Sequence, residues 1–138
     1  MKNDVSVPVS RVPEMIRRSA EAMRALVPGC RPVPFGHMGD GNFHIIPLMK
    51  LEDKRDRKKI LPAMKEVNNL VLKYGGSLSG EHNDGLVRGP WLEQMYGKEM
   101  LQLFRETKNI FDPQHIFNPH KKANATWDYS YSHIREHF

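Results

Sequence analysis

The chain has 138 residues and a single cysteine, a length that suits one domain and a cysteine count that excludes an internal disulfide framework. No apolar run approaches the roughly 20 residues of a membrane-spanning helix, and the N-terminus has no apolar signal-peptide core, so we expect a cytoplasmic protein. The net charge of +5 comes from dispersed basic residues interspersed with acidic ones, which argues against nucleic-acid binding and favours small anionic substrates.

The first two predicted elements are a strand and an amphipathic helix. Residues 4–9 alternate apolar and polar side chains, which is typical of a half-buried strand. Residues 12–27 repeat apolar side chains at steps of three and four, which predicts a helix. Ser10 is a suitable N-cap for this helix, and Pro28-Gly29 would end it.

The next elements complete a recognisable order. Residues 31–35 contain two prolines and are predicted to be extended, and residues 42–49 form a second extended segment beyond a glycine-rich turn. Residues 53–73 carry a helical apolar stripe, and residues 77–81 are predicted as a fourth strand. The order βαββαβ predicts an α+β fold with a ferredoxin-like antiparallel sheet and helices on one face.

The second half of the chain is more helical. Residues 91–96 and 98–111 predict one or two further helices, stopped by Asp112-Pro113. We therefore expect a domain over residues 1–122 and a C-terminal tail over residues 123–138, which either packs on the domain or lies disordered.

Two histidines and a glutamate suggest a metal site. Zinc and similar divalent ions bind imidazole nitrogen and carboxylate oxygen, and a catalytic site uses three protein ligands and leaves one position open. His37, His44 and Glu81 supply that number of ligands for zinc, manganese, iron or cobalt. His82 can serve as a general base at neutral pH. Taken singly, however, each histidine is more often an ordinary surface or hydrogen-bonded residue than a metal ligand.

Three ordered motifs resemble the C-terminal domain of FAD-linked oxidases, the group with D-lactate, glycolate and D-2-hydroxyglutarate dehydrogenases within the vanillyl-alcohol-oxidase flavoprotein superfamily. The resemblance runs from Lys2 to about Lys121. The motifs are Gly36-His37-Met38-Gly39-Asp40-Gly41-Asn42-Phe43-His44, Gly80-Glu81-His82-Asn83-Asp84-Gly85, and Phe111-Asp112-Pro113 followed by Ile116-Phe117-Asn118-Pro119. Three motifs in this order are more specific than any one alone.

The resemblance implies a role for each residue of the candidate site. The metal ligands would be His37, His44 and Glu81, and His82 would take the proton from the hydroxyl of a D-2-hydroxy acid. Substrate would contact Lys2, Asn42 and His82, and the flavin would lie near Asn118 and Glu81.

Two departures from the family pattern refine these expectations. Asn83 stands where a glycine is common, which can alter the floor of the pocket. Ile46 stands where enzymes of hydroxy-dicarboxylates often have a polar residue, which favours a smaller or more apolar 2-hydroxy acid.

The resemblance also implies that FAD is held mainly by a domain absent from this chain. We therefore expect a fragment, or a subunit that joins a separate flavin-binding chain, with an apolar docking face through which the isolated chain can form a homodimer. Two other functions stay open. One is a non-catalytic metal- or ligand-binding module, and the other is a stand-alone metal-dependent hydrolase that needs no flavin.

Overall fold

The computed structural model describes residues 3–134, which divide into two compact units. We call residues 3–82 unit 1 and residues 83–134 unit 2, and describe each separately. Among the described residues, no helix combines the length and the hydrophobicity that crossing a bilayer requires.

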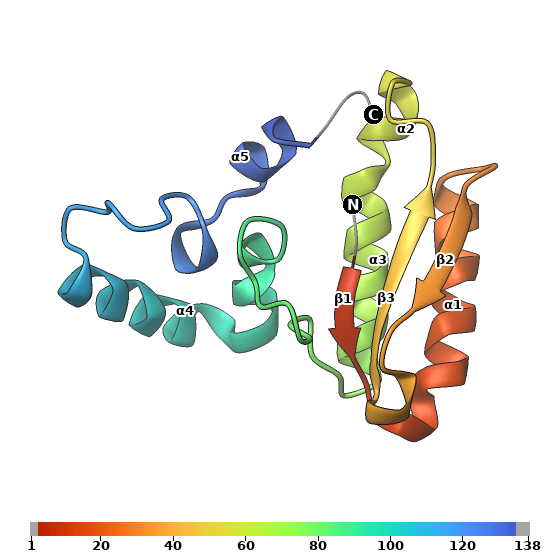
Figure 1. Cartoon of the computed structure of the whole chain (residues 1–138), viewed down its shortest axis with the longest axis horizontal. Coiled ribbons are helices and arrows are strands. Elements are labelled where there is room, and N and C mark those ends of the chain that lie inside the picture. Colours follow the sequence, from red (N-terminus) through yellow and green to blue (C-terminus); the bar gives the residue numbers. More distant parts are fainter. Residues whose placement is uncertain (1–2, 135–138) are drawn as a thin grey trace. The chain divides into compact units, whose positions relative to one another are not determined.

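Unit 1 is a three-stranded antiparallel sheet with helices on one face (Figure 1). The sheet order is β1-β3-β2, and contacts between α1 and α3 close the helical layer. This confirms the predicted α+β class. The elements are β1 (Asn3–Ser6), α1 (Val12–Leu26), β2 (Arg31–Phe35), β3 (Asn42–Leu48), α2 (Lys54–Lys58) and α3 (Ile60–Lys73).

The two helices predicted in unit 1 are present, but the N-cap of the first and the continuity of the second differ from the predictions. A 3-10 turn over Val9–Arg11 precedes α1, so Arg11 and not Ser10 is the N-cap residue. The helix predicted for residues 53–73 is divided at Lys59 into α2 and α3. Asp53 caps α2 by accepting the backbone N–H of Arg55 at 2.8 Å. Hydrogen bonds from the Arg55 side chain, and secondarily from its backbone, lower the pKa of the Asp53 carboxyl to about 2.

The predicted fourth strand is reduced to a single bridge. Ser6 and Ser77 exchange two backbone hydrogen bonds, and Gly80 donates to the carbonyl of Asp4 at 3.1 Å. Between these contacts, the hydroxyl of Ser77 bonds both the N–H and the carbonyl of Ser79. These local bonds replace a strand ladder, so the segment runs beside β1 without forming a regular strand.

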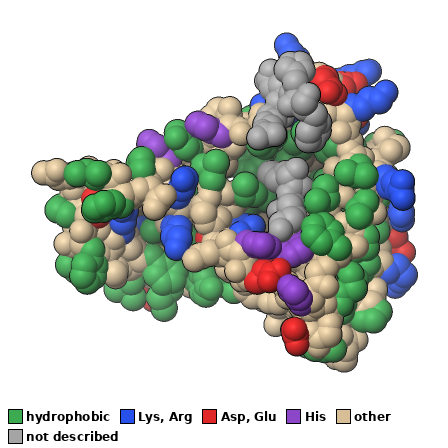
Figure 2. Space-filling view, in the orientation of Figure 1, with side chains coloured by type: hydrophobic (Ala, Val, Ile, Leu, Met, Phe, Trp, Pro, Cys, Tyr) green, Lys and Arg blue, Asp and Glu red, His purple; other side chains and the backbone are tan. Residues whose placement is uncertain are grey.

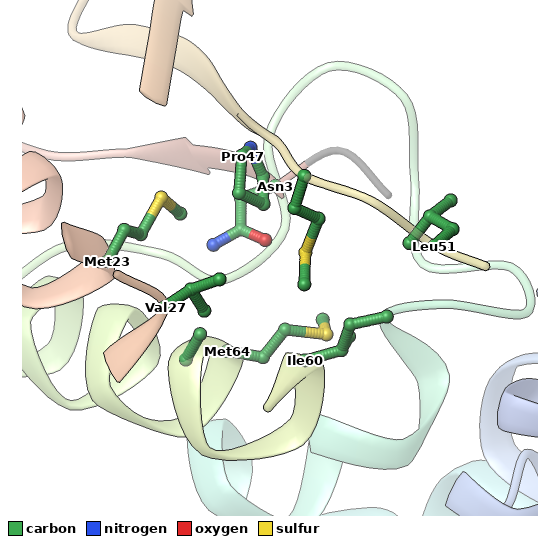
Figure 3. Close-up of a pocket in the computed structure, with 9 residues that line it drawn as sticks. Asn3, Met23, Val27, Pro47, Leu51, Ile60 and Met64 are labelled. Carbon is green, nitrogen blue, oxygen red and sulfur yellow. The ribbon is translucent and has the colours of Figure 1, made fainter. Parts of the chain in front are cut away.

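The core of unit 1 lies between the sheet and the helices. Its fully buried side chains include Val5, Phe43, Ile45, Met15, Val67 and Val71. At the start of β1, a small cavity of about 20 Å³ lies between α1, α3 and the end of β3 (Figure 3). The side chain of Asn3 lines this cavity beside Met23 and Met64.

Unit 2 is built around α4 (Leu92–Phe111), which is broken at Gly97, where φ is +82° and ψ is 168°. The break falls between residues 91–96 and 98–111, for which one or two helices were predicted. Leu92, Leu101 and Ala123 form a small core with Phe104. The described part of the expected tail is ordered as a helix, α5 (Trp127–Ser132), which the sequence pattern did not predict.

Candidate metal and substrate site

Three imidazoles surround the carboxylate of Glu81 in unit 1. His44 Nε2 lies 3.0 Å from Glu81 Oε1, and His37 Nε2 lies 3.2 Å from Glu81 Oε2. His82 Nε2 lies 3.5 Å from Glu81 Oε1, and the His82 ring centroid is 5.1 Å from that of His44. The structure therefore brings together all four residues predicted for the metal and the base.

Backbone geometry places His37 and His44 on opposite sides of one turn. A 3-10 turn over Met38–Asp40 follows His37, and Gly41 closes it with a φ of +82°. A Cβ on Gly41 would lie 2.2 Å from the carbonyl oxygen of Val7, so only glycine fits both the conformation and the space. β3 then begins at Asn42 and carries His44.

The site has one buried wall and one open side. The side chain of His44 is only 4% exposed, whereas those of His37, His82 and Glu81 are 63%, 51% and 39% exposed. Histidine and acidic side chains gather on this part of the surface (Figure 2). A ligand can therefore approach the cluster from solvent while His44 is held by the protein.

The donor set fits a divalent metal ion. One ligand atom from each of His44, Glu81 and His82 lies within 4.8 Å of the other two, which is a spacing that an ion can bridge. His37 is outside this closest group, although its Nε2 is near Glu81. The described geometry thus supports three imidazoles and one carboxylate as the available donors.

A buried carboxylate, which the sequence analysis did not single out, lies beneath this cluster. Asp4 is fully buried on β1, directly opposite His44 on β3. Its Oδ1 accepts a hydrogen bond from Asn42 Nδ2 at 3.0 Å, and its Oδ2 accepts the backbone N–H of His82 at 2.8 Å. The sequence offered one sign of this role, which is an acidic residue within a short strand that otherwise contributes to the core.

Asn42, predicted to contact substrate, is largely buried and makes structural contacts. Its Nδ2 also donates to the carbonyl of Val5 at 3.1 Å, and its Oδ1 has no hydrogen-bond partner among the described residues. Lys2, predicted to contact substrate, lies outside the described residues.

Asn118, predicted to lie near the flavin, is in unit 2 and has a φ of +46°. Its Oδ1 accepts a hydrogen bond from Lys121 Nζ at 3.4 Å. It lines a cavity of about 610 Å³ within unit 2, together with lysines and aromatic residues. Those neighbours include Tyr96, Phe104, Phe117, Lys108 and Lys122.

Comparisons with known proteins agree with the motifs. The family described as FAD linked oxidases, C-terminal domain, matches residues 1–122. A D-2-hydroxyglutarate dehydrogenase of Stutzerimonas stutzeri is 34% identical over 87% of this chain and 26% of its own length. A D-lactate dehydrogenase of Archaeoglobus fulgidus is 36% identical over 86% of the chain and 25% of its own length.

A third relative carries a different enzyme name, and it too is much longer than this chain. Glycolate oxidase subunit GlcD of Bacillus subtilis is 31% identical over 86% of this chain and 25% of its own length. The chain thus spans about a quarter of each of these three relatives. Because the family match covers most of the chain, this protein belongs to the C-terminal domain family of FAD-linked oxidases.

Proposed function

We propose that this chain is the substrate- and metal-binding part of a flavin-dependent dehydrogenase that oxidises a D-2-hydroxy acid to the 2-oxo acid. The observation that carries the proposal is the convergence of His37, His44 and His82 on the Glu81 carboxylate. Family membership and the names of three relatives support the same reaction class.

In this proposal, His37, His44 and Glu81 hold a divalent metal ion, which is zinc, manganese, iron or cobalt. A metal held there would supply polarisation of the substrate's 2-hydroxyl, and FAD would supply the acceptor for the hydride that leaves C2. The imidazole of His82 takes the hydroxyl proton, which leaves the 2-oxo acid. Its 51% exposure leaves it accessible to substrate, and its backbone is tied to Asp4.

The substrate we favour has a small or apolar side chain. In a strand, alternate residues share a face, so Ile46 stands on the same face as His44. Cross-strand pairing places Phe35 and Val33 beside them, and the Phe35 ring lies 4.9 Å from the His44 ring. An apolar surface next to the metal donors gives a second substrate carboxylate no favourable contact. In this scheme, Lys2 completes the substrate contacts, whereas the largely buried Asn42 supports the site through its hydrogen bond to Asp4.

We further propose that FAD is held mainly by a separate domain or subunit, with Asn118 and Glu81 near the flavin. The aromatic and lysine side chains around the unit 2 cavity suit part of a planar anionic cofactor. A cytoplasmic location and a homodimer remain predictions. Two relatives are named as mitochondrial, a putative D-lactate dehydrogenase of Schizosaccharomyces pombe and a cytochrome-linked one of Arabidopsis thaliana.

The proposed reaction can be tested by joining this chain to the flavin-binding part of a relative and following flavin absorbance. We expect D-lactate to bleach the flavin faster than D-2-hydroxyglutarate. His82→Gln should slow the bleaching by at least about 100-fold, because a general base typically contributes that much. His115→Gln changes an exposed histidine of unit 2 and is the matched control.

The outcomes separate the alternative functions. Equal bleaching rates in the fusion and its His82→Gln variant would contradict the role of His82. Metal binding without flavin reduction in any fusion would favour the non-catalytic binding module. Hydrolysis of an ester or phosphate substrate by the chain alone would favour the metal-dependent hydrolase.

A further inference from the structure

We propose that Asp4 is the positioning residue of this site and sets the geometry of His44, Glu81 and His82 from beneath. Asp4 reaches no solvent, with an exposed fraction of 0%. It therefore acts through the residues that it contacts. The inference rests on the proposed function only for what the positioned residues then do.

The contacts of Asp4 tie three parts of the site to β1. Its Oδ2 accepts the N–H of His82, and its carbonyl accepts the N–H of Gly80 at 3.1 Å. The segment that carries Glu81 is thus held on both sides of Glu81 by one residue. The imidazoles lie around the Glu81 carboxylate, so these two hydrogen bonds to Asp4 fix the position of Glu81 relative to His37 and His44.

The same carboxylate sets the buried imidazole. Asp4 Oδ1 lies 3.2 Å from His44 Nδ1, while His44 Nε2 faces Glu81. The Nδ1 contact is within ion-pair distance but lacks the alignment of a formed hydrogen bond. A carboxylate at Nδ1 favours a proton on that atom and leaves Nε2 as the ligand atom. Such partners orient histidine ligands in many metal sites.

Gly80 provides the space that this arrangement needs. A Cβ built on Gly80 would lie 2.3 Å from Asp4 Oδ1 and 2.4 Å from Asn42 Nδ2. Contacts that short cannot be accommodated without moving the carboxylate. Gly80→Ala is therefore a second way to displace Asp4 while keeping its charge and every ligand residue.

The test is a calorimetric zinc titration of the 138-residue chain, with Asp4→Asn and Gly80→Ala as the variants. Asparagine keeps the size of Asp4 but replaces one acceptor oxygen by a donor. One of the donors now facing Asp4, on Asn42, His44 or His82, then loses its acceptor. We expect both variants to weaken zinc binding by about 10- to 100-fold, the usual effect of losing such a partner.

Asp112→Asn is the matched control. Asp112 is another buried aspartate that accepts backbone N–H groups, but it lies in unit 2. Its substitution should leave zinc affinity unchanged. If Asp4→Asn binds zinc as tightly as the unmodified chain, the positioning role is wrong.

Amide exchange of His82, followed by NMR in the metal-free chain, gives a readout that needs no metal. We expect the His82 amide to be protected in the unmodified chain and to exchange faster in both variants. If the unmodified chain binds no zinc but shows this pattern, the metal proposal fails while the role of Asp4 stands. If the His82 amide exchanges freely in the unmodified chain, the role of Asp4 fails without any variant.

Discussion

Among single residues, the effect of a buried polar atom on the free energy of unfolding depends on whether that atom has a hydrogen-bond partner. Asp4 and Asn42 are buried and hydrogen-bonded to each other beneath the Glu81 cluster. Asn3, next to Asp4, is 5% exposed, and its Nδ2 has no hydrogen-bond partner among the described residues. Its side chain lines an apolar cavity (Figure 3).

We therefore expect Asn3→Val to raise the free energy of unfolding by about 1 kcal/mol, because an unpaired buried donor costs about 1–3 kcal/mol. Valine also suits a strand. Urea denaturation measures the change, and Asn3→Ser, which keeps a donor at this position, should give no such gain. A valine variant no more stable than the serine variant would contradict the cost assigned to the Asn3 amide.

The three motifs singled out His37, His44, Glu81 and His82, and the structure places these four side chains together. Residue types alone would not have done so, and they did not single out the buried carboxylate beneath the cluster. The involvement of Asp4 depends on strand register, because its pairing with His44 comes from the antiparallel alignment of β1 and β3. Nothing in the spacing of two residues 40 positions apart in the sequence reveals that alignment.

At the scale of elements, a buried aspartate ends α4 and organises the loop that follows. The carboxylate of Asp112 accepts the N–H groups of Ile116 at 2.9 Å and Phe117 at 3.0 Å, and also accepts from Lys108. Lys108 Nζ also donates to the carbonyl of Phe117 at 2.8 Å. The hydrogen bond from Lys108 is the largest cause of an Asp112 pKa below its usual 3.8.

This lowered pKa predicts how stability depends on pH. The folded state favours the ionised Asp112, so its contribution is fully present above pH 3.8 and is lost as pH falls through the lower folded pKa. We expect Asp112→Asn to lower the thermal unfolding midpoint at neutral pH. The difference from the unmodified chain should shrink well below pH 3.8. A difference that stays constant with pH would contradict the role of the ionised carboxylate.

Element types were easier to predict from sequence than element ends. Apolar periodicity identified α1 almost to the residue, because this helix buries one face against the core. The two prolines of β2 and the glycine-rich turn before β3 located those two strands equally closely. The fourth strand was wrong in extent because the Ser77 hydroxyl takes the backbone groups of Ser79. α5 was missed because its short sequence has no apolar period and is stabilised by the Thr126 cap and by contacts within unit 2.

Considered as a whole, the chain corresponds to only part of the length of its relatives. It spans about a quarter of their length, and unit 2 exposes large apolar side chains on α4 and in the loop that follows. Hydrophobic side chains gather along α4 in Figure 2. The most exposed are Ile110, Phe111, Ile116 and Phe117. These residues are the best candidates for the apolar docking face that the sequence predicts.

We propose above that the Glu81 cluster binds a divalent metal ion. The most direct test is the metal content of the purified chain after incubation with zinc or manganese, measured by mass spectrometry beside His37→Ala and Glu81→Ala. His115→Ala, outside the cluster, is the control. We predict near-stoichiometric metal in the chain and the control, and its loss in both site variants. Equal metal in all four proteins, or none in the unmodified chain, would contradict the proposed site.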